Sequence, residues 1–292
     1  MTERGKTRPF AAHVRAGAET LPRALELIRE EPFLIRVDDR PYSVVMRTPG
    51  DELAHAAGFC LGEGIVSDPG DIETLGYDEE LDPNIVDVWL RPERHDQIHD
   101  RLERRFFVSQ TSCGVCGKEL IQDLQQILVP TENLFELPLD RAFDCIRKLS
   151  DSQKHYQTTR GSHASLLFDG ELDVLAFAED VGRHNALDKA IGKAFLAGEV
   201  TSARLAVLSS RISYELVQKA ARARLPMMLS ESRPTSLAVE IGQALGMTLA
   251  YPDGDSELVV VCGRERILPV RAWPGAQSQP STRPQDGRRV AL

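Results

Sequence analysis

The sequence contains no apolar segment long enough to cross a membrane, because a membrane-spanning helix needs about 18 or more consecutive apolar residues. The first residues, MTERGKTRPF, are charged where a secretory signal peptide would be apolar. These two absences predict a cytoplasmic protein that has no membrane partner.

An excess of positive charge is also absent. The chain has 35 Lys and Arg against 44 Asp and Glu, a formal net charge of −9, whereas nucleic-acid-binding proteins usually carry a basic surface. The motifs G-x-G-x-x-G and G-x-x-x-x-G-K-[ST] do not occur, and no repeat of fixed period is visible. The sequence therefore argues against a nucleic-acid partner, a standard dinucleotide site and a P-loop. Because the chain as a whole is acidic, hydrogen-bond donors within the binding site would have to hold any anionic ligand.

Cysteine is rare and odd in number, with five in 292 residues. Since the cytoplasm keeps thiols reduced, a chemical role explains a close pair of cysteines better than a structural disulfide does. Cys113 and Cys116 form the one close pair, in SQTSCGVCGKEL, while Cys60, Cys145 and Cys262 are isolated. A structural zinc site normally needs four ligands, and no histidine follows at zinc-finger spacing. The H-x-E signature of zinc deaminases is missing as well, so we expect no bound metal.

Three interpretations of the Cys113 and Cys116 pair remain open from the residues alone. The pair can be two incidental core cysteines, a thioredoxin-like dithiol before a helix, or a reactive thiolate near the cation of Lys118. The flanking Gly114 and Gly117, together with polar neighbours and no apolar periodicity, favour an exposed and pliant loop. A thiolate in such a loop is a nucleophile.

The length of 292 residues fits one large domain or two ordinary ones. We expect a loosely ordered N-terminal tail over residues 1–20 and a smaller α+β domain over 21–106. A mobile loop with the cysteine pair and the helix after it would follow over 107–135. An α/β domain over 136–270 and a disordered tail over 271–292, rich in Pro, Gly, Ser and Gln, would complete the chain.

Two patterns give the fold class, which we predict to be α/β. In PFLIRVDDRPYSVVMRTP, β-branched and aromatic residues flank Asp38 and Asp39, which predicts a hairpin. From residue 164 onwards, strand-like segments alternate with helices of 10 to 15 residues. This alternation is typical of βαβ units and predicts a mostly parallel sheet flanked by helices.

Four polar loops follow the strands of this predicted sheet: EDVGRH, SRIS, SESRPTS and PDGDS. Ligands of open α/β sheets bind outside the carboxyl ends of the strands, so these loops are the expected rim of one pocket. Gly182 permits a tight turn, Asn185 can cap the following helix, and Arg183 and His184 would face an anion. Arg211 and Arg233 stand with hydroxyl side chains at two further helix starts. Ordinary capped helices with solvated side chains remain the alternative.

Five stretches resemble blocks of the formate dehydrogenase accessory sulfurtransferase family, often called FdhD. They are TPGDELAHAAGFCLGEGIV, TSCGVCGK, EDVGRHNALDKAIG, ELVQKAA and PTSLAVEIGQALGMTL, and the likeness spans roughly residues 30–268. The resemblance implies a protein that accepts sulfur from a cysteine desulfurase as a persulfide on Cys113, with Cys116 in the same motif. It also implies delivery of that sulfur to the molybdenum bis(molybdopterin guanine dinucleotide) cofactor, bound as a client, before this cofactor enters formate dehydrogenase.

The resemblance further implies a cytidine-deaminase-like fold for the C-terminal domain, without the deaminase metal site. The guanylate-binding stretch of the family falls here on Pro252, Asp253, Gly254, Asp255, Ser256 and Glu257. This stretch is acidic where many relatives are aromatic and basic, so backbone amides or carboxylate contacts to a guanine edge would replace phosphate contacts. Arg160 stands where relatives usually have glycine and could add a compensating cation.

Two other functions remain alternatives to sulfur transfer: a chaperone that carries the cofactor without transferring sulfur, and a dithiol oxidoreductase. The sequence leaves open whether the chain forms a homodimer.

Overall fold

The computed structural model describes residues 5–17, 19–76, 82–105 and 135–270. The cysteine pair at 113 and 116, the rest of the predicted loop up to residue 134, and the predicted tail over 271–292 lie outside the described residues. No helix within the described ranges is both long and apolar enough to span a membrane.

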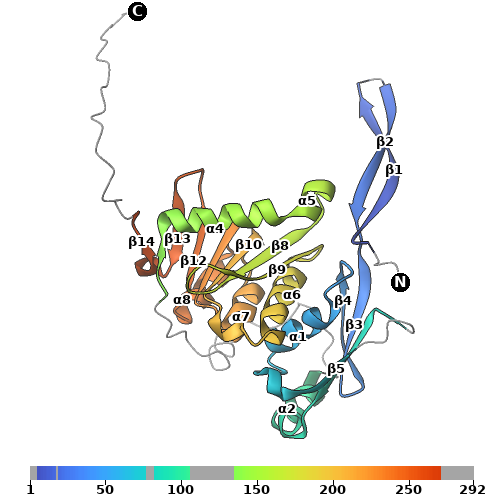
Figure 1. Ribbon diagram of the computed structural model, residues 1–292, viewed down its shortest axis with the longest axis vertical. Coiled ribbons are helices and arrows are strands. Elements are labelled where there is room, and N and C mark those ends of the chain that lie inside the picture. Colours follow the sequence, from blue (N-terminus) through green and yellow to red (C-terminus); the bar gives the residue numbers. More distant parts are fainter. Residues whose placement is uncertain (1–4, 18, 77–81, 106–134, 271–292) are drawn as a thin grey trace, which may run out of the picture.

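The N-terminal half forms a hairpin, a four-stranded sheet and two helices (Figure 1). The hairpin pairs β1 with β2, and the sheet has the order β4-β3-β6-β5. The bounds are β1 Thr7–Ala16, β2 Glu19–Ile28, β3 Glu31–Val37, β4 Arg40–Arg47, α1 Glu52–Gly62, β5 Ile72–Gly76, β6 Ile85–Leu90 and α2 Pro92–Arg105.

The predicted hairpin around Asp38 and Asp39 is confirmed as β3 and β4. Both turn residues are in the left-handed region, with φ of 48° and 63°, as a two-residue type I′ turn requires. The expectation of a loose tail over residues 1–20 is wrong for most of its length, because Thr7–Ala16 is strand β1. Regular pairing with β2 across a turn at Gly17, where φ is 61°, satisfies the backbone groups on the edge of β1 that faces β2.

The C-terminal half is built on a six-stranded sheet with the order β13-β12-β11-β10-β8-β9. The bounds are β7 Leu137–Pro138, α4 Leu139–Ser152, α5 Lys154–Thr159, β8 His163–Phe168, β9 Val174–Asp180, α6 Arg183–Leu196, β10 Leu205–Arg211, α7 Tyr214–Arg222, β11 Met227–Ser232, α8 Ser236–Ala244, β12 Thr248–Pro252, β13 Leu258–Cys262 and β14 Ile267–Leu268. The α/β class is confirmed, and the predicted strands and helices of this half occur in the predicted order.

The expectation of a mostly parallel sheet is wrong, because only the pairs β10–β11 and β11–β12 are parallel. The pairs β8–β9, β10–β8 and β12–β13 are antiparallel. Short turns join β8 to β9 and β12 to β13, and a short turn can connect only antiparallel neighbours. The sheet is therefore mixed, with a parallel centre.

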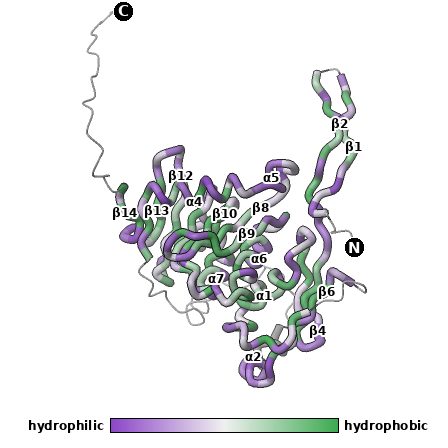
Figure 2. The backbone as a smooth tube through the Cα atoms, in the orientation of Figure 1, coloured by the Kyte–Doolittle hydropathy of each residue, from purple (hydrophilic) through white to green (hydrophobic). Residues whose placement is uncertain are grey.

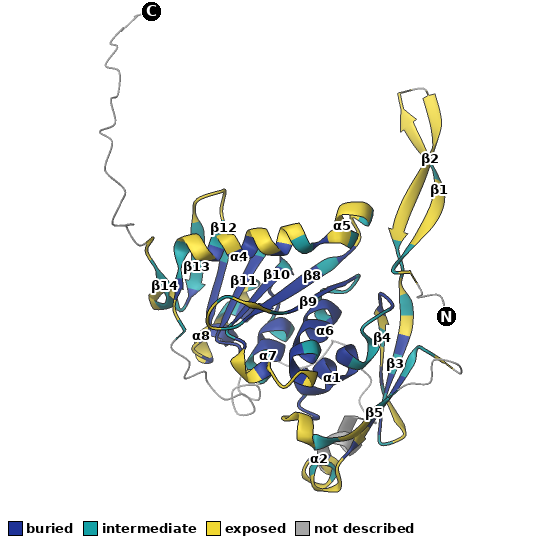
Figure 3. Ribbon diagram, viewed as in Figure 1, coloured by how far each residue is buried: buried dark blue, intermediate teal, exposed yellow. Residues whose placement is uncertain are grey.

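Helices cover both faces of this sheet (Figure 3). Alternate residues point to opposite faces of a strand, so Leu166 and Phe168 pack with Leu149 of α4, whereas Leu167 packs with Leu187 and Ile191 of α6. The core on the α6 side continues without interruption into the N-terminal half. There it includes the inward residues of β3 and β6 and most of α1.

Helices α1 and α6 cross at two glycines, which joins the two halves of the molecule. A Cβ atom on Gly58 would lie 1.9 Å from the backbone oxygen of Asp188, and one on Gly192 would lie 1.7 Å from that of Ala54. Only glycine fits at either position. The described residues of the two predicted units therefore share one core.

Candidate functional site

The carboxyl ends of β9, β10, β11 and β12 lie at the same edge of the sheet. Both β9 and β10 are antiparallel to β8, and β10, β11 and β12 are mutually parallel, so all four strands run in one direction. The loops predicted as a rim therefore share one edge, which we call the rim (residues 181–184, 211–213, 233–235 and 253–257). Four strand spacings of about 4.8 Å separate β9 from β12, so the rim is about 19 Å long.

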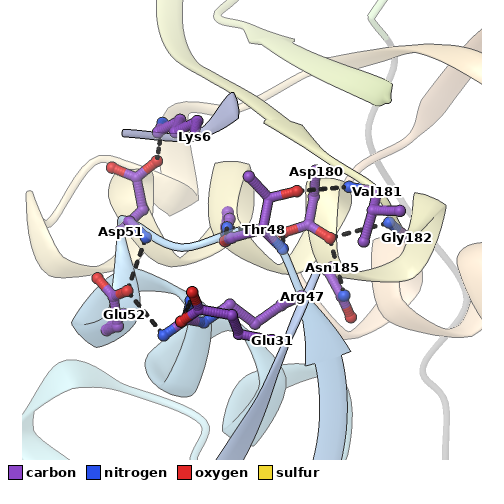
Figure 4. A network of polar contacts seen from close by, with 12 residues as sticks. Lys6, Glu31, Arg47, Thr48, Asp51, Glu52, Asp180, Val181, Gly182 and Asn185 are labelled. Atoms are coloured by element: carbon purple, nitrogen blue, oxygen red, sulfur yellow. Dashed lines mark hydrogen bonds and ion pairs between the residues drawn. The ribbon is translucent and has the colours of Figure 1, made fainter. Parts of the chain in front are cut away.

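A buried carboxylate, Asp180, anchors one end of the rim (Figure 4). Its Oδ2 accepts hydrogen bonds from the backbone N–H of Thr48 at 3.0 Å and from Nζ of Lys189 at 2.6 Å. Its Oδ1 accepts from the N–H of Gly182 and from Nδ2 of Asn185, both at 2.9 Å. Four donors satisfy this charge, which makes its burial tolerable.

Asn185 does not cap α6, contrary to the prediction. Gly182 is the residue at the cap, and Asn185 Nδ2 donates instead to Asp180 and, at 2.7 Å, to the carbonyl oxygen of Met46. Lys189 in turn donates to the carbonyl oxygen of Thr48 at 2.7 Å. The polar residues of EDVGRHNALDK thus fix the end of β4 to the start of α6, which holds the rim in place.

Arg183 and His184 lie on the solvent side of this anchor and are both partly exposed. The Nε atom of Arg183 is buried and has no hydrogen-bond partner among the described residues. His184 Nε2 lies 2.9 Å from Oε2 of Glu215 and 3.4 Å from Oγ of Ser213, both at the start of α7. The hydrogen bond from His184 lowers the pKa of Glu215, which keeps this carboxyl ionised.

His163, at the first position of β8, lies at the same end of the rim because it pairs with Asp180. Burial lowers the pKa of His163, and the positive charge of Arg183 lowers it further. The imidazole of His163 and the unused Nε donor of Arg183 therefore lie at the same end of the rim.

The other predicted site residues are spread along the rim. Arg211 is exposed at the carboxyl end of β10, and Arg233 lies over the ring of Tyr251 at 5.8 Å from its centroid. The stretch Pro252–Glu257 closes the turn between β12 and β13, where Asp253 N–H donates to the carbonyl oxygen of Glu257 at 2.8 Å. Residues 253–257 are exposed. The rim thus has a basic end at Arg183 and an acidic end about 19 Å away.

Arg160 shows why glycine suits its position. Its backbone has φ of 55°, in the left-handed region that glycine adopts without cost, and it terminates α5. Its guanidinium stacks over Tyr156, 5.3 Å from the ring centroid.

Several residues of this site have no local signal in the sequence. Thr48 contacts Asp180, and Glu215 contacts His184. The two residues of each pair are far apart in the chain, so no spacing rule links them. Lys189 carries a weak signal, because it lies one turn after Asn185 on an otherwise apolar helix face. A charged residue on such a face is normally paired.

A second buried ion pair lies behind the rim, where Lys219 Nζ of α7 donates to Oδ2 of Asp188 at 2.9 Å. Burial raises the pKa of Asp188 to about 6, because desolvation of the carboxylate outweighs the attraction of Lys219. The folded pKa is above the ordinary value, so the folded chain binds the proton more tightly than the unfolded chain. This contribution to stability is full below about pH 4 and is lost as the pH rises through about 6.

Urea unfolding of the wild type and Asp188→Asn at several pH values tests this dependence. The wild type is expected to lose stability relative to the variant as the pH rises from about 4 to 7, by at most about 1.4 kcal/mol per pH unit. A difference that stays constant over this range would contradict the raised pKa.

Away from the rim, a surface cavity of about 360 Å³ lies at the opposite edge of the sheet. It lies between the start of β12 and the end of β13, and it contains none of the predicted site residues. The cavity is lined by Gln243, Gly246, Met247, Val260, Val261, Cys262, Gly263, Arg264, Glu265 and Arg266.

The isolated cysteines are all buried. Burial raises the pKa of the Cys145 thiol to about 11 and raises the pKa values of Cys60 and Cys262. A thiol with a raised pKa is protonated at neutral pH and is a poor nucleophile.

The model of the FdhD/NarQ family matches residues 28–268. The chain belongs to this family. Among curated FdhD relatives, the sulfur carrier protein FdhD of Streptomyces coelicolor is 35% identical over 285 residues, covering 91% of this chain and 96% of that protein. The sulfur carrier protein FdhD of Mycobacterium bovis is 37% identical over 255 residues, covering 82% and 90% of the two chains.

A solved structure supports the fold. The chain superposes on a crystal structure described as a formate dehydrogenase accessory protein from Desulfotalea psychrophila with a TM-score of 0.72. The sequences are 22% identical, and the match covers 90% of this chain and 100% of that one. The family resemblance seen in the sequence is therefore confirmed, whereas the cytidine-deaminase-like description stays a prediction.

Proposed function

We propose that this member of the FdhD/NarQ family is a sulfurtransferase that carries sulfur as a persulfide on Cys113. A cysteine desulfurase donates the sulfur, and the molybdenum bis(molybdopterin guanine dinucleotide) cofactor receives it as substrate before entering formate dehydrogenase. The names of the relatives, sulfur carrier protein FdhD, support the general activity.

The observation that most supports the proposal is that Cys60, Cys145 and Cys262 are buried. A persulfide carrier must meet a donor protein and then an acceptor, so its sulfur has to reach solvent. The sequence has five cysteines, and this condition leaves Cys113 and Cys116. Both lie outside the described residues, and their glycine-rich, polar surroundings favour an accessible loop.

The first step is an exchange that needs no external oxidant. The Cys113 thiolate attacks the outer sulfur of the desulfurase persulfide, a new S–S bond forms on Cys113, and the S–S bond of the donor breaks. The desulfurase cysteine leaves as a thiolate and can be protonated. Lys118, five residues beyond Cys113, would stabilise the negative charge of the carrier.

Three features of the rim support binding of the guanylate part of the proposed substrate. The unused Nε donor of Arg183, at the start of α6, suits a phosphate oxygen, and the N-terminal amides of α6 favour the same charge. At the other end, the exposed carboxylates of Asp253, Asp255 and Glu257 can accept hydrogen bonds from a guanine edge. The length of the rim suits an elongated ligand.

Isothermal titration with GDP tests the rim. Arg183→Ala and Arg211→Ala are each expected to weaken binding by roughly 10- to 150-fold, since each removes a charge-assisted hydrogen bond. Arg264→Ala is the matched control, because Arg264 is exposed at the opposite edge of the sheet. Unchanged affinity in both rim variants would place the nucleotide elsewhere.

Mass spectrometry tests the sulfur step directly. After incubation with a cysteine desulfurase and cysteine, the intact protein should gain the mass of one sulfur atom on a single cysteine, and a reductant should remove it. A cofactor chaperone without sulfur transfer would gain nothing. A dithiol oxidoreductase would instead lose two hydrogens: one thiol accepts the outer sulfur of the desulfurase persulfide, and the second thiol attacks the first, forms the disulfide and releases that sulfur as hydrosulfide.

A further inference from the structure

Two histidines, His95 and His99, lie about one turn apart on helix α2, which is largely hydrophilic (Figure 2). Residues four positions apart in a helix lie on the same face. The centroids of the two imidazole rings are 5.5 Å apart. Two imidazoles that bind one tetrahedral ion through nitrogens at about 2.1 Å place their centroids about 5.2 Å apart. The pair therefore has nearly the spacing of a helical metal chelate.

A carboxylate from another part of the chain lies beside this pair. Asp38, in the turn between β3 and β4, has its Oδ2 atom 3.9 Å from Nε2 of His95. This oxygen is buried and has no hydrogen-bond partner among the described residues, a condition that calls for a bound water or ion. The distance is too long for a hydrogen bond, but it is close to the separation of about 3.4 Å between a nitrogen and an oxygen on one tetrahedral ion.

The rest of Asp38 is held in place by the end of β6. Its Oδ1 accepts a hydrogen bond from the backbone N–H of Leu90 at 2.9 Å. Its own backbone N–H donates to the carbonyl oxygen of Val88 at 3.0 Å. These two bonds leave Oδ2 as the oxygen that faces α2.

Helix α2 is also fixed, so the two histidines stand on a rigid support. Ile98, between them in the sequence, is buried in the shared core. Arg94 donates from Nε to the carbonyl oxygen of Ile65 at 2.7 Å and from Nη2 to that of Gly64 at 2.9 Å. Ligands on well-supported elements bind a metal more tightly than ligands on loose ones, because less order is imposed on binding.

The second ring nitrogen of His95 has a carboxylate neighbour as well. Nδ1 lies 3.6 Å from Oδ1 of Asp96. A histidine that binds a metal through one nitrogen usually donates its other ring N–H to a carboxylate, which orients the ring. With Nε2 on the ion, Nδ1–H faces Asp96.

We propose that His95 and His99 chelate a divalent transition-metal ion such as Zn²⁺, with Asp38 Oδ2 as the third ligand and water completing the coordination. Imidazole and carboxylate ligands suit this class of ion. Within the part of the chain that the structure describes, no three such side chains are already gathered closely enough to hold a metal. The ion itself therefore draws Asp38 onto the two histidines, through a shift of about 0.5 Å.

This site differs from a structural zinc site, which has four protein ligands and no water. A site with three protein ligands at the surface exchanges its ion with solvent. Binding connects α2 to the turn between β3 and β4 and should stabilise the N-terminal sheet. The inference does not rest on the proposed function.

Titration calorimetry with Zn²⁺ tests the pair, in tag-free protein whose Cys113 and Cys116 are replaced by serine because free thiolates also bind zinc. This background protein should bind one equivalent. His95→Gln and His99→Gln should each weaken binding by at least about 10-fold, since loss of even an orienting partner has an effect of that size. His13→Gln, at an exposed histidine on β1, is the control and should bind as the background does. Equal affinity in the background and in both α2 variants would overturn the proposal.

Asp38→Asn tests the third ligand without disturbing the turn. Asparagine tolerates the left-handed backbone of this position, where φ is 48°, and its side-chain oxygen can still accept from the N–H of Leu90. The variant should bind Zn²⁺ about 10-fold more weakly, because an amide replaces the charged oxygen. Unchanged affinity would mean that Oδ2 is satisfied by water and would overturn its role as a ligand.

Pulsed electron paramagnetic resonance with Cu²⁺ in place of Zn²⁺ counts the histidines directly, because Cu²⁺ binds such ligands more tightly still. The background protein should show couplings to the remote nitrogens of two imidazoles, and His95→Gln and His99→Gln should each show one. Urea unfolding in the presence of a chelator should give the same stability for the background and both variants, which confirms that the fold is intact. Coupling to a single imidazole in the background protein would overturn chelation by the pair.

Discussion

Gly192→Ala is expected to lower the free energy of unfolding by several kcal/mol or to prevent folding. The added methyl group would lie 1.7 Å from the carbonyl oxygen of Ala54, a backbone atom that no side-chain rotation can move. Helices α1 and α6 would have to separate, which would open the core that they share. Overpacking usually costs about 1–3 kcal/mol, and a collision between two backbones belongs to the upper end of that range or beyond it.

The sign of this effect is informative, because alanine is the better helix former. In an exposed helix, glycine to alanine would gain about 1 kcal/mol. Urea unfolding of Gly192→Ala and of Gly58→Ala should both show destabilisation, since the two glycines face each other across the crossing. Gly76→Ala is the control, because, among the described residues and apart from the chain neighbours of Gly76, no atom lies within 4 Å of the added Cβ. Wild-type stability in both crossing variants would contradict the close packing of α1 on α6.

The elements that sequence alone could predict are those with local causes. The turn at Asp38 and Asp39 and the strand-like and helical segments after residue 164 each depend on residues that are near one another in the chain. Strand direction in the large sheet depends on which strands become neighbours. Periodicity carries no information on that choice, so the parallel order was predicted for too many strands.

The same distinction applies to the candidate site. Sequence order and strand ends place Arg183, His184 and Arg211 at one edge, because carboxyl ends of strands that run in one direction share an edge. The partners that hold these residues come from far away. Thr48 reaches Asp180 across 132 positions, and Glu215 reaches His184 across 31. Asn185 was expected to cap its own helix because local bonding is the default for that residue, whereas the fold offers it Met46 and Asp180.

The N-terminal hairpin of β1 and β2 was missed for a related reason. Its strands alternate in hydrophobicity, but the first residues are polar and resemble a tail. The face that carries Phe10, Val14, Leu21 and Leu25 becomes visible only when the register of β1 against β2 is known, because the opposed residues on that face lie between 3 and 19 positions apart.

Cys113→Ala is expected to abolish sulfur transfer and the activation of formate dehydrogenase, whereas Cys116→Ala should keep a substantial fraction of both. A persulfide carrier needs one thiolate, and the family resemblance assigns it to Cys113. A dithiol switch would need both cysteines equally, because each resolves the disulfide of the other. The two single variants therefore separate the mechanisms.

The matched control for these variants is Cys145→Ala. Cys145 is buried against the sheet on α4, and its raised pKa makes it unreactive, so its loss should leave sulfur transfer unchanged. Formate dehydrogenase activity in cells and persulfide mass in purified protein should fall together for Cys113→Ala, while circular dichroism shows an intact fold. Equal and complete loss in both Cys113→Ala and Cys116→Ala would contradict a single carrier. Full activity without Cys113 would contradict Cys113 as the carrier and would leave Cys116 as the accessible thiol, because Cys60, Cys145 and Cys262 are buried.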